Sequence, residues 1–116
     1  MTRVLVLDDD ASTAELMRIV LEDAAFAVTV GVTAEPLPPG PFDCVVSDLM
    51  SATVYSLEAT QAWLRRLDQR YPGAPVILVT AHPEVASDRD RLAARRVIVK
   101  PFDVDELVGA VDELTA

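Results

Sequence analysis

Hydrophobic and polar residues follow two different periods along the chain, and the changes between them mark the expected elements. Short, nearly continuous apolar runs rich in Val, Ile and Leu are typical of strands that are buried on both faces of a parallel sheet. Such runs occupy residues 3–8, 26–32, 43–48, 74–81 and 96–100. Longer segments with apolar residues at helical spacing lie between them, which predicts strands and helices in alternation.

Four of the intervening segments are predicted to be helices, and two of them carry start signals. Ser12 and Glu15 form a Ser-x-x-Glu capping box, which predicts that the first helix begins there. Asp103 is the predicted N-cap of the last helix, whose apolar residues recur at helical intervals. The predicted helices cover residues 12–24, 56–71, 82–96 and 103–114.

One connection departs from this alternation. Residues 33–42, between the second and third predicted strands, read TAEPLPPGPF and contain four prolines and a glycine. Proline lacks the backbone donor that a helix interior needs, and its ring clashes with the preceding turn. The second helix of the alternation is therefore predicted to be shortened to a single turn or absent.

Alternating strands and helices predict an α/β fold: a doubly wound, five-stranded parallel sheet with helices on both faces. A chain of 116 residues is expected to form one domain, over residues 1–116. In such folds ligands bind outside the carboxyl ends of the strands. Polar side chains stand at that end of four predicted strands: Asp8 and Asp9, Asp48, Thr80 and Lys100.

Composition narrows the class of partner. The formal net charge of -9 argues against direct binding of nucleic acid, which relies on clustered Lys and Arg. The single cysteine, Cys44, cannot form an internal disulfide, and the chain begins without a signal-peptide pattern, so a reducing cytoplasm is expected. No uncharged apolar run approaches the roughly 18 residues of a membrane span. We expect a cytoplasmic domain without membrane contact.

Four motifs at the strand ends resemble those of the response-regulator receiver domain, the phosphoacceptor half of a two-component signalling pair (the CheY-like superfamily). They are VLDDD, VVSDLM, ILVTAH and IVKPF, which occur in the family's order over essentially the whole chain. The resemblance implies a flavodoxin-like sheet with strand order 2-1-3-4-5. It also implies that a sensor histidine kinase or a phosphotransfer protein supplies the phosphoryl group.

The resemblance further implies a role for each motif residue. Asp48 would be the phosphorylated residue. Thr80 would donate its hydroxyl to the phosphoryl group and Lys100 would pair with it, with a cis peptide bond between Lys100 and Pro101. A magnesium ion would be held by Asp8, Asp9, Asp48 and the backbone carbonyl of Met50.

This residue set makes chemical sense of three adjacent carboxylates at the tip of a buried strand. Like charges this close repel one another unless a cation lies among them. Phosphoryl transfer to a carboxylate depends on positioning and charge neutralisation, which Mg²⁺ and Lys100 would supply. We therefore expect the acidic tip to be a cation site, with Asp10 left facing solvent. We also expect a self-phosphorylating acceptor at most, and no turnover enzyme.

Departures from the family pattern leave a second interpretation. Ala52 and Ser56 stand where the family usually has proline and glycine after the acceptor. Val97 stands where the family often has an aromatic residue that swings inward on activation. The chain is thus also compatible with a pseudo-receiver, an interaction or dimerisation module that acts without phosphorylation.

A third interpretation is an enzyme of another class. DDDAST resembles the opening motif of haloacid-dehalogenase-type phosphatases, with Asp8 as nucleophile and Asp10 as acid. However, no acidic strand-end pair follows Lys100, and the chain lacks room for a substrate-selecting cap. Turnover of a generic phosphate ester would distinguish such an enzyme from a receiver.

The remaining features concern packing and output. In receivers, the face formed by the fourth helix, the fifth strand and the last helix is commonly used for dimerisation, and here the fourth helix carries DRDRLAARR. Those charges are typical either of a solvated helix or of a surface that selects a partner. His82 is either a loop residue or a residue that tunes phosphoryl lifetime. Cys44 is expected in the core, and Trp63 is expected in helix packing.

Overall fold

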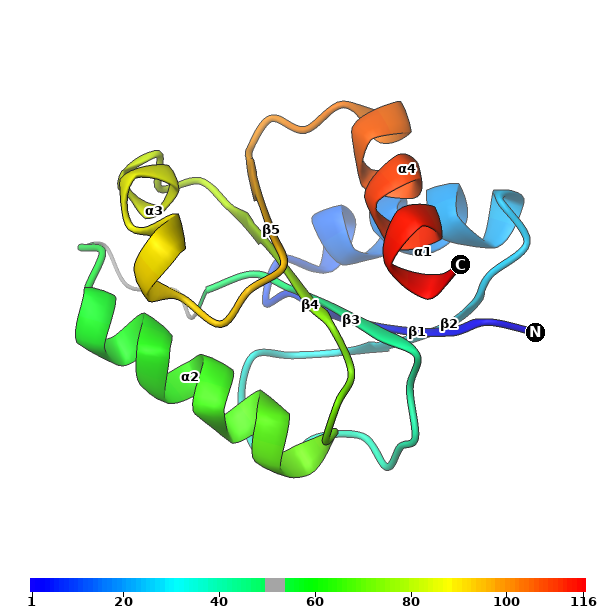
Figure 1. Cartoon of the computed structure of the whole chain (residues 1–116). Helices are drawn as coiled ribbons and strands as arrows, with labels where there is room; N and C mark the ends of the chain where they lie inside the picture. Colours follow the sequence, from blue (N-terminus) through cyan, green and yellow to red (C-terminus); the bar gives the residue numbers. More distant parts are fainter. Residues whose placement is uncertain (50–53) are drawn as a thin grey trace.

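The sheet contains five parallel strands in the order β2-β1-β3-β4-β5. The computed structural model describes residues 1–49 and 54–116 (Figure 1). This architecture confirms the predicted doubly wound, flavodoxin-like fold. The strands are β1 (Arg3–Leu7), β2 (Ala27–Gly31), β3 (Cys44–Ser47), β4 (Val76–Thr80) and β5 (Arg96–Val99).

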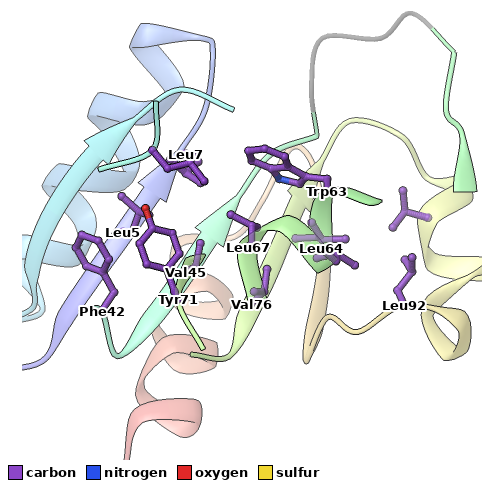
Figure 2. Packing of buried hydrophobic residues seen from close by; sticks show 13 residues of the cluster. Leu5, Leu7, Phe42, Val45, Trp63, Leu64, Leu67, Tyr71, Val76 and Leu92 are labelled. Atoms are coloured by element: carbon purple, nitrogen blue, oxygen red, sulfur yellow. The ribbon is translucent and has the colours of Figure 1, made fainter. Parts of the chain in front are cut away.

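Helices cover both faces of this sheet (Figure 1). Alternate strand residues face opposite sides: Val4 and Val6 pack in the cluster with α1 and α4, whereas Leu5 and Leu7 pack in the cluster with α2. Figure 2 shows the second cluster, which includes Trp63, Leu64 and Leu67 of α2. The helices are α1 (Ala11–Asp23), α2 (Leu57–Arg70), α3 (Glu84–Ser87) and α4 (Val104–Thr115), with a 3₁₀ turn, η1 (Arg89–Arg91).

The start of α1 differs from the prediction. The N-cap is Asp10, whose Oδ1 accepts hydrogen bonds from the backbone amides of Ser12 (3.0 Å) and Thr13 (3.2 Å). The predicted capping box at Ser12 and Glu15 is wrong, because Ser12 already lies within the helix. An aspartate one residue before the helix satisfies the free amides of the first turn, and its charge is favoured there.

The predicted helix over residues 82–96 is much shorter than expected. It is helical only in α3 and η1, and at Leu92 the chain turns to extended geometry (φ -115°, ψ 141°). Leu92 is buried against the sheet, and the amide of Arg95 bonds to the Val76 carbonyl at 2.8 Å to begin the pairing with β4. These tertiary contacts outweigh the helical propensity of residues 92–96. By contrast, the predicted N-cap of α4 is correct: Asp103 accepts from the amide of Asp105 at 2.8 Å.

The proline-rich segment contains no helix, as predicted. Its chain instead packs Leu37 and Phe42 into the cluster beneath α2. The Tyr71 hydroxyl at the end of α2 donates to the Pro38 carbonyl at 2.6 Å and holds the segment against the sheet. In the described parts of the chain, no helix has the length and apolar character needed to cross a bilayer.

Candidate functional site

Four strand ends meet at one edge of the sheet, as the parallel topology requires. The amide of Asp48 bonds to the Leu7 carbonyl at 2.8 Å, which extends the pairing of β1 with β3 by one residue. The amide of Lys100 bonds to the Thr80 carbonyl at 2.7 Å, which extends the pairing of β4 with β5. The side chains that follow these strands therefore face a common site.

Lys100 lies between the two carboxylates at the centre of the edge. Its Nζ is 3.0 Å from Asp8 Oδ2 and 3.2 Å from Asp48 Oδ2. The Asp8 side chain is fully buried (0 % exposed), whereas those of Asp48 and Lys100 are each 20 % exposed. Lys100 is therefore shared between a buried carboxylate and a solvent-accessible one.

These contacts set the electrostatics of the site. Burial raises the pKa of Asp48, and the charge of Asp8 raises it further, against the opposing effect of Lys100. Burial by itself would lower the pKa of Lys100, but its hydrogen bond to Asp8 and the charges of both aspartates outweigh burial and raise it. Lys100 thus remains a cation, and an additional positive charge near Asp48 would further favour its ionised form.

The three consecutive aspartates have separate roles. Asp8 Oδ1 accepts the Asp10 amide at 2.8 Å, while Asp10 caps α1. Asp9 is exposed, and its Oδ1 accepts the Thr33 amide at 2.9 Å, across from the end of β2. Only Asp8 of the three contacts Lys100. The expectation that Asp10 merely faces solvent is incomplete, since this exposed side chain holds the helix start.

Thr80, like Asp8, is a buried member of the predicted site. Its side chain is fully buried at the end of β4, and Oγ1 accepts the His82 amide at 3.1 Å. The predicted magnesium ligand Met50 lies outside the described residues. The peptide bond between Lys100 and Pro101 is cis, as the family resemblance implied.

The donor set suits a hard divalent cation. Within residues 1–49 and 54–116, no three His, Cys, Asp or Glu side chains form a cluster that could hold a metal by itself. Magnesium does not require one, because it commonly takes one or two carboxylates and completes its coordination with waters and substrate oxygens. Asp8, Asp9 and Asp48 supply carboxylate oxygens at or beside this edge.

Two residues that the sequence analysis did not place at the site lie directly behind it. Trp63 is 7 % exposed and packs in the core as predicted, but its Nε1 also donates to Ser47 Oγ at 2.9 Å. Ser47 is fully buried next to Asp48. The available sequence signal was a polar residue inside an otherwise apolar strand, immediately before Asp48.

A second overlooked contact joins the loop after Asp48 to the segment between α3 and η1. The hydroxyl of Tyr55 donates to Asp88 Oδ2 at 2.8 Å, and the Tyr55 ring lies 6.3 Å from that of His82 between centroids. Together with Trp63 these rings line a hollow of about 50 Å³. No spacing rule in the sequence links positions so far apart.

The fold and this set of strand-end residues are those of a receiver-type domain, and the family comparison agrees. The model of the response regulator receiver domain matches residues 4–112, so the chain belongs to that family. The family membership favours this interpretation over the phosphatase alternative.

Individual relatives show how far the similarity extends. The transcriptional regulatory protein FixJ of Bradyrhizobium diazoefficiens is 30% identical over 115 residues, covering 94% of this chain and 54% of the relative. The DNA-binding transcriptional regulator NtrC of Escherichia coli K12 is 31% identical, covering 94% of this chain and 24% of the relative. The chain therefore spans about half, or less, of the length of these relatives.

Among solved structures, the response regulator TrrA of Thermotoga maritima in complex with Mg²⁺-BeF has a TM-score of 0.78. It is 29% identical, and the match covers 98% of this chain and 99% of that one. TrrA is thus a full-length structural match, and its complex contains the metal that the donor set of this chain suits.

Proposed function

We propose that residues 1–116 form a cytoplasmic phosphoacceptor domain that receives a phosphoryl group on Asp48 from a sensor histidine kinase or a phosphotransfer protein. The observation that supports this most is the position of Lys100 between Asp8 and Asp48. A carboxylate nucleophile must approach a phosphoryl group that is itself negative, and a fixed cation 3.2 Å from the nucleophile lowers that repulsion.

The transfer balances as a substitution at phosphorus. An oxygen of Asp48 forms the new P–O bond while the P–N bond of the donor phosphohistidine breaks. The electron pair of the broken bond returns to the imidazole, which takes up a proton from solvent. The product is an aspartyl phosphate whose additional charge Lys100 neutralises, and Thr80 is proposed to donate its hydroxyl to a phosphoryl oxygen.

Magnesium is the proposed cofactor, held by Asp8, Asp9, Asp48 and the backbone carbonyl of Met50. When bound, it supplies positive charge to the phosphoryl oxygens. The Thr33 amide holds Asp9 Oδ1 and so limits the directions in which this carboxylate can turn. The buried Asp8 keeps Lys100 in place.

The test is an intact-mass measurement after incubation with a small acyl phosphate, with and without Mg²⁺. We expect the mass to rise by one phosphoryl group only with Mg²⁺, and we expect Asp48→Asn to abolish the gain. No gain in a folded protein that binds Mg²⁺ would instead support the pseudo-receiver. The same preparation should show almost no turnover of a generic phosphate ester.

For output, we propose contact with a second copy of this chain through α3–η1, β5 and α4. Charge complementarity supports this choice. The segment from η1 to β5 carries the exposed arginines Arg89, Arg91 and Arg95, with Asp90 among them, whereas the exposed charged residues of α4 are all acidic. We propose that a two-fold axis places the arginine segment of each copy opposite the partner's α4. Direct contact of residues 1–116 with nucleic acid is not expected, although the longer relative NtrC is called DNA-binding.

Sedimentation equilibrium of the phosphorylated protein tests this dimer. We expect Arg91→Glu to weaken self-association about tenfold or more, and added salt to weaken it as well. Arg65→Glu is the matched control, because Arg65 is also exposed but lies on α2. Equal effects of the two variants, or a monomer at all concentrations, would contradict this output surface.

A further inference from the structure

We propose that Trp63 and Ser47 are positioning residues for the phosphoacceptor, through a buried chain of two hydrogen bonds that ends on the Asp48 backbone. The inference rests on the proposed function of Asp48. The Trp63 Nε1 donates to Ser47 Oγ at 2.9 Å, and Ser47 Oγ donates to the Asp48 carbonyl at 2.7 Å. We call these three groups the Trp63–Ser47 clamp.

The direction of the clamp is fixed by the chemistry of its members. The indole nitrogen can only donate, and a carbonyl oxygen can only accept. The Ser47 hydroxyl has one proton, which must therefore point to the Asp48 carbonyl, while a lone pair of the same oxygen receives the indole proton. The serine cannot rotate to another partner without leaving a buried polar group unsatisfied, which is costly.

The clamp acts on the nucleophile through one peptide unit. The peptide that joins Asp48 to Leu49 has its carbonyl held by Ser47, and its N–H donates to Asp48 Oδ1 at 2.8 Å. Because a peptide unit is planar, fixing the carbonyl also fixes the N–H. The clamp therefore sets the donor that orients the carboxylate, with Oδ2 directed to Lys100 at 3.2 Å.

The location of Trp63 makes this restraint rigid. The indole is 7 % exposed and lies in the cluster with Leu64 and Leu67 on the buried face of α2 (Figure 2). Ser47 belongs to β3, which is paired on both sides. The acceptor is thus tied from the rear to both the sheet and α2. A nucleophile that must approach phosphorus in line benefits strongly from such restraint.

Two variants separate the links of the clamp. Ser47→Ala removes the bond to the Asp48 carbonyl and leaves the indole N–H without its acceptor. Trp63→Phe removes the indole donor but leaves the serine bonded to the carbonyl. We expect Ser47→Ala to slow phosphorylation at saturating acyl phosphate and Mg²⁺ by roughly fivefold to tenfold, and Trp63→Phe by less, as befits the loss of one or two hydrogen bonds.

A positioning role is distinguished from a metal-binding role by comparing the phosphorylation rate with the affinity for Mg²⁺. We expect the half-saturating Mg²⁺ concentration to remain within about twofold of wild type, because Ser47 bonds to the Asp48 backbone carbonyl and to no carboxylate oxygen of Asp8, Asp9 or Asp48. Leu67→Val is the matched control: it lies one turn along the same face of α2 and shortens a side chain of the same cluster, but it removes neither hydrogen bond of the clamp. It should lower the melting temperature and leave the phosphorylation rate unchanged.

A second measurement does not depend on phosphorylation. Trp63 is the only tryptophan, so its indole N–H gives one resolved proton signal. We expect slow exchange of this proton with solvent in the wild type and faster exchange in Ser47→Ala. The variant that combines Ser47→Ala with Trp63→Phe should be no less stable than Ser47→Ala alone, because it no longer buries an indole N–H that lacks an acceptor.

The outcomes are distinguishable. Normal phosphorylation of the wild type and unchanged rates in both variants would overturn the clamp alone, as would an indole proton that exchanges equally fast with and without Ser47. A wild type that accepts no phosphoryl group would overturn the proposed function and this role of the clamp together. A slower rate in the Leu67→Val control would also overturn it, because general destabilisation would then explain the effect.

Discussion

Among single residues, Thr33 buries a hydroxyl group at a cost to the stability of the fold. Its side chain is 1 % exposed, and Oγ1 is the one buried side-chain N or O atom within the described ranges that has no hydrogen-bond partner. Valine has nearly the same shape without the hydroxyl. We expect Thr33→Val to raise the free energy of unfolding by about 1 kcal/mol, measured by urea denaturation without Mg²⁺.

Thr60 provides the matched control for that prediction. It is equally buried, but its Oγ1 donates to the Ser56 carbonyl at 2.8 Å. Thr60→Val removes a hydrogen bond that exists, so it should lower the free energy of unfolding by about 1 kcal/mol. Two changes of the same sign would show that the Thr33 hydroxyl already has a partner.

The surroundings of Tyr55 raise the pKa of its hydroxyl. Burial, followed by the hydrogen bond to Asp88 and the charge of Asp88, raises the pKa of Tyr55 from 10.0 to about 12. The folded state then binds the phenolic proton more tightly than the unfolded state does. The resulting contribution to stability is complete below pH 10 and is lost as the pH rises from 10 to about 12.

The measurement uses Tyr71→Phe, which leaves Tyr55 as the only tyrosine. Ultraviolet absorbance should titrate with a midpoint near 12 in the folded protein, and Asp88→Asn should move this midpoint toward 10. A midpoint that does not respond to Asp88 would contradict the bond. Cys44 illustrates the same physics: burial first, with the charge of Asp43, raises the pKa of its thiol to about 12, consistent with its predicted place in the core.

At the scale of elements, α1 shows how closely two start signals can compete. Asp10 accepts hydrogen bonds from two free amides of the first turn, whereas the Ser12 hydroxyl only donates to Asp10 Oδ1 at 2.8 Å. We expect Asp10→Ala to lower the melting temperature by a few degrees and Ser12→Ala to lower it less. The reverse order, in thermal unfolding followed by circular dichroism, would restore the capping box that the sequence suggested.

The elements also show where sequence patterns suffice and where they do not. Strand positions were predictable within a residue or two, because a parallel strand buried on both faces must be apolar throughout. The predicted helix over residues 82–96 was not, because its second half leaves the helix to bury Leu92 and to pair Arg95 with β4. Local periodicity carries no information about such distant contacts.

Some residues of the candidate site could likewise be predicted from the sequence, and others could not. Topology alone brings the ends of β1, β3, β4 and β5 to one edge, so Asp8, Asp48, Thr80 and Lys100 could be named from the sequence. The Trp63–Ser47 clamp could not be predicted from the sequence, because the side chain that reaches Ser47 comes from α2, sixteen residues further along the chain. Amphipathic spacing predicts that Trp63 is buried but not which polar atom its indole meets.

Taken whole, the molecule has an excess of negative charge. Its formal net charge is -9, and the exposed ion pairs, such as that between Arg96 and Glu113, are of the kind that contributes little. Like charges on a small surface repel and oppose folding. We expect the melting temperature at pH 7 to rise by a few degrees between about 0.02 M and 0.3 M NaCl, as the Debye length shortens.

Scanning calorimetry at several NaCl concentrations measures this effect. Near pH 4.4, where the net charge approaches zero, the salt dependence should largely vanish. A melting temperature that falls with salt at pH 7 would indicate that the exposed ion pairs outweigh the overall repulsion.

The pairing of Lys100 with Asp8 joins residues 92 positions apart in the sequence. The strands that carry them, β1 and β5, are not neighbours, so two further strands must be in register before the contact can form. Contacts of such high sequence separation have a greater loop-closure cost than local ones, and we expect this contact to form late in folding. Because β5 is also an edge strand, fraying of that strand alone would withdraw the lysine while the rest of the sheet stayed folded. Under the proposed function, acceptance of a phosphoryl group would therefore require a completely folded sheet, and partly folded chains would not be phosphorylated.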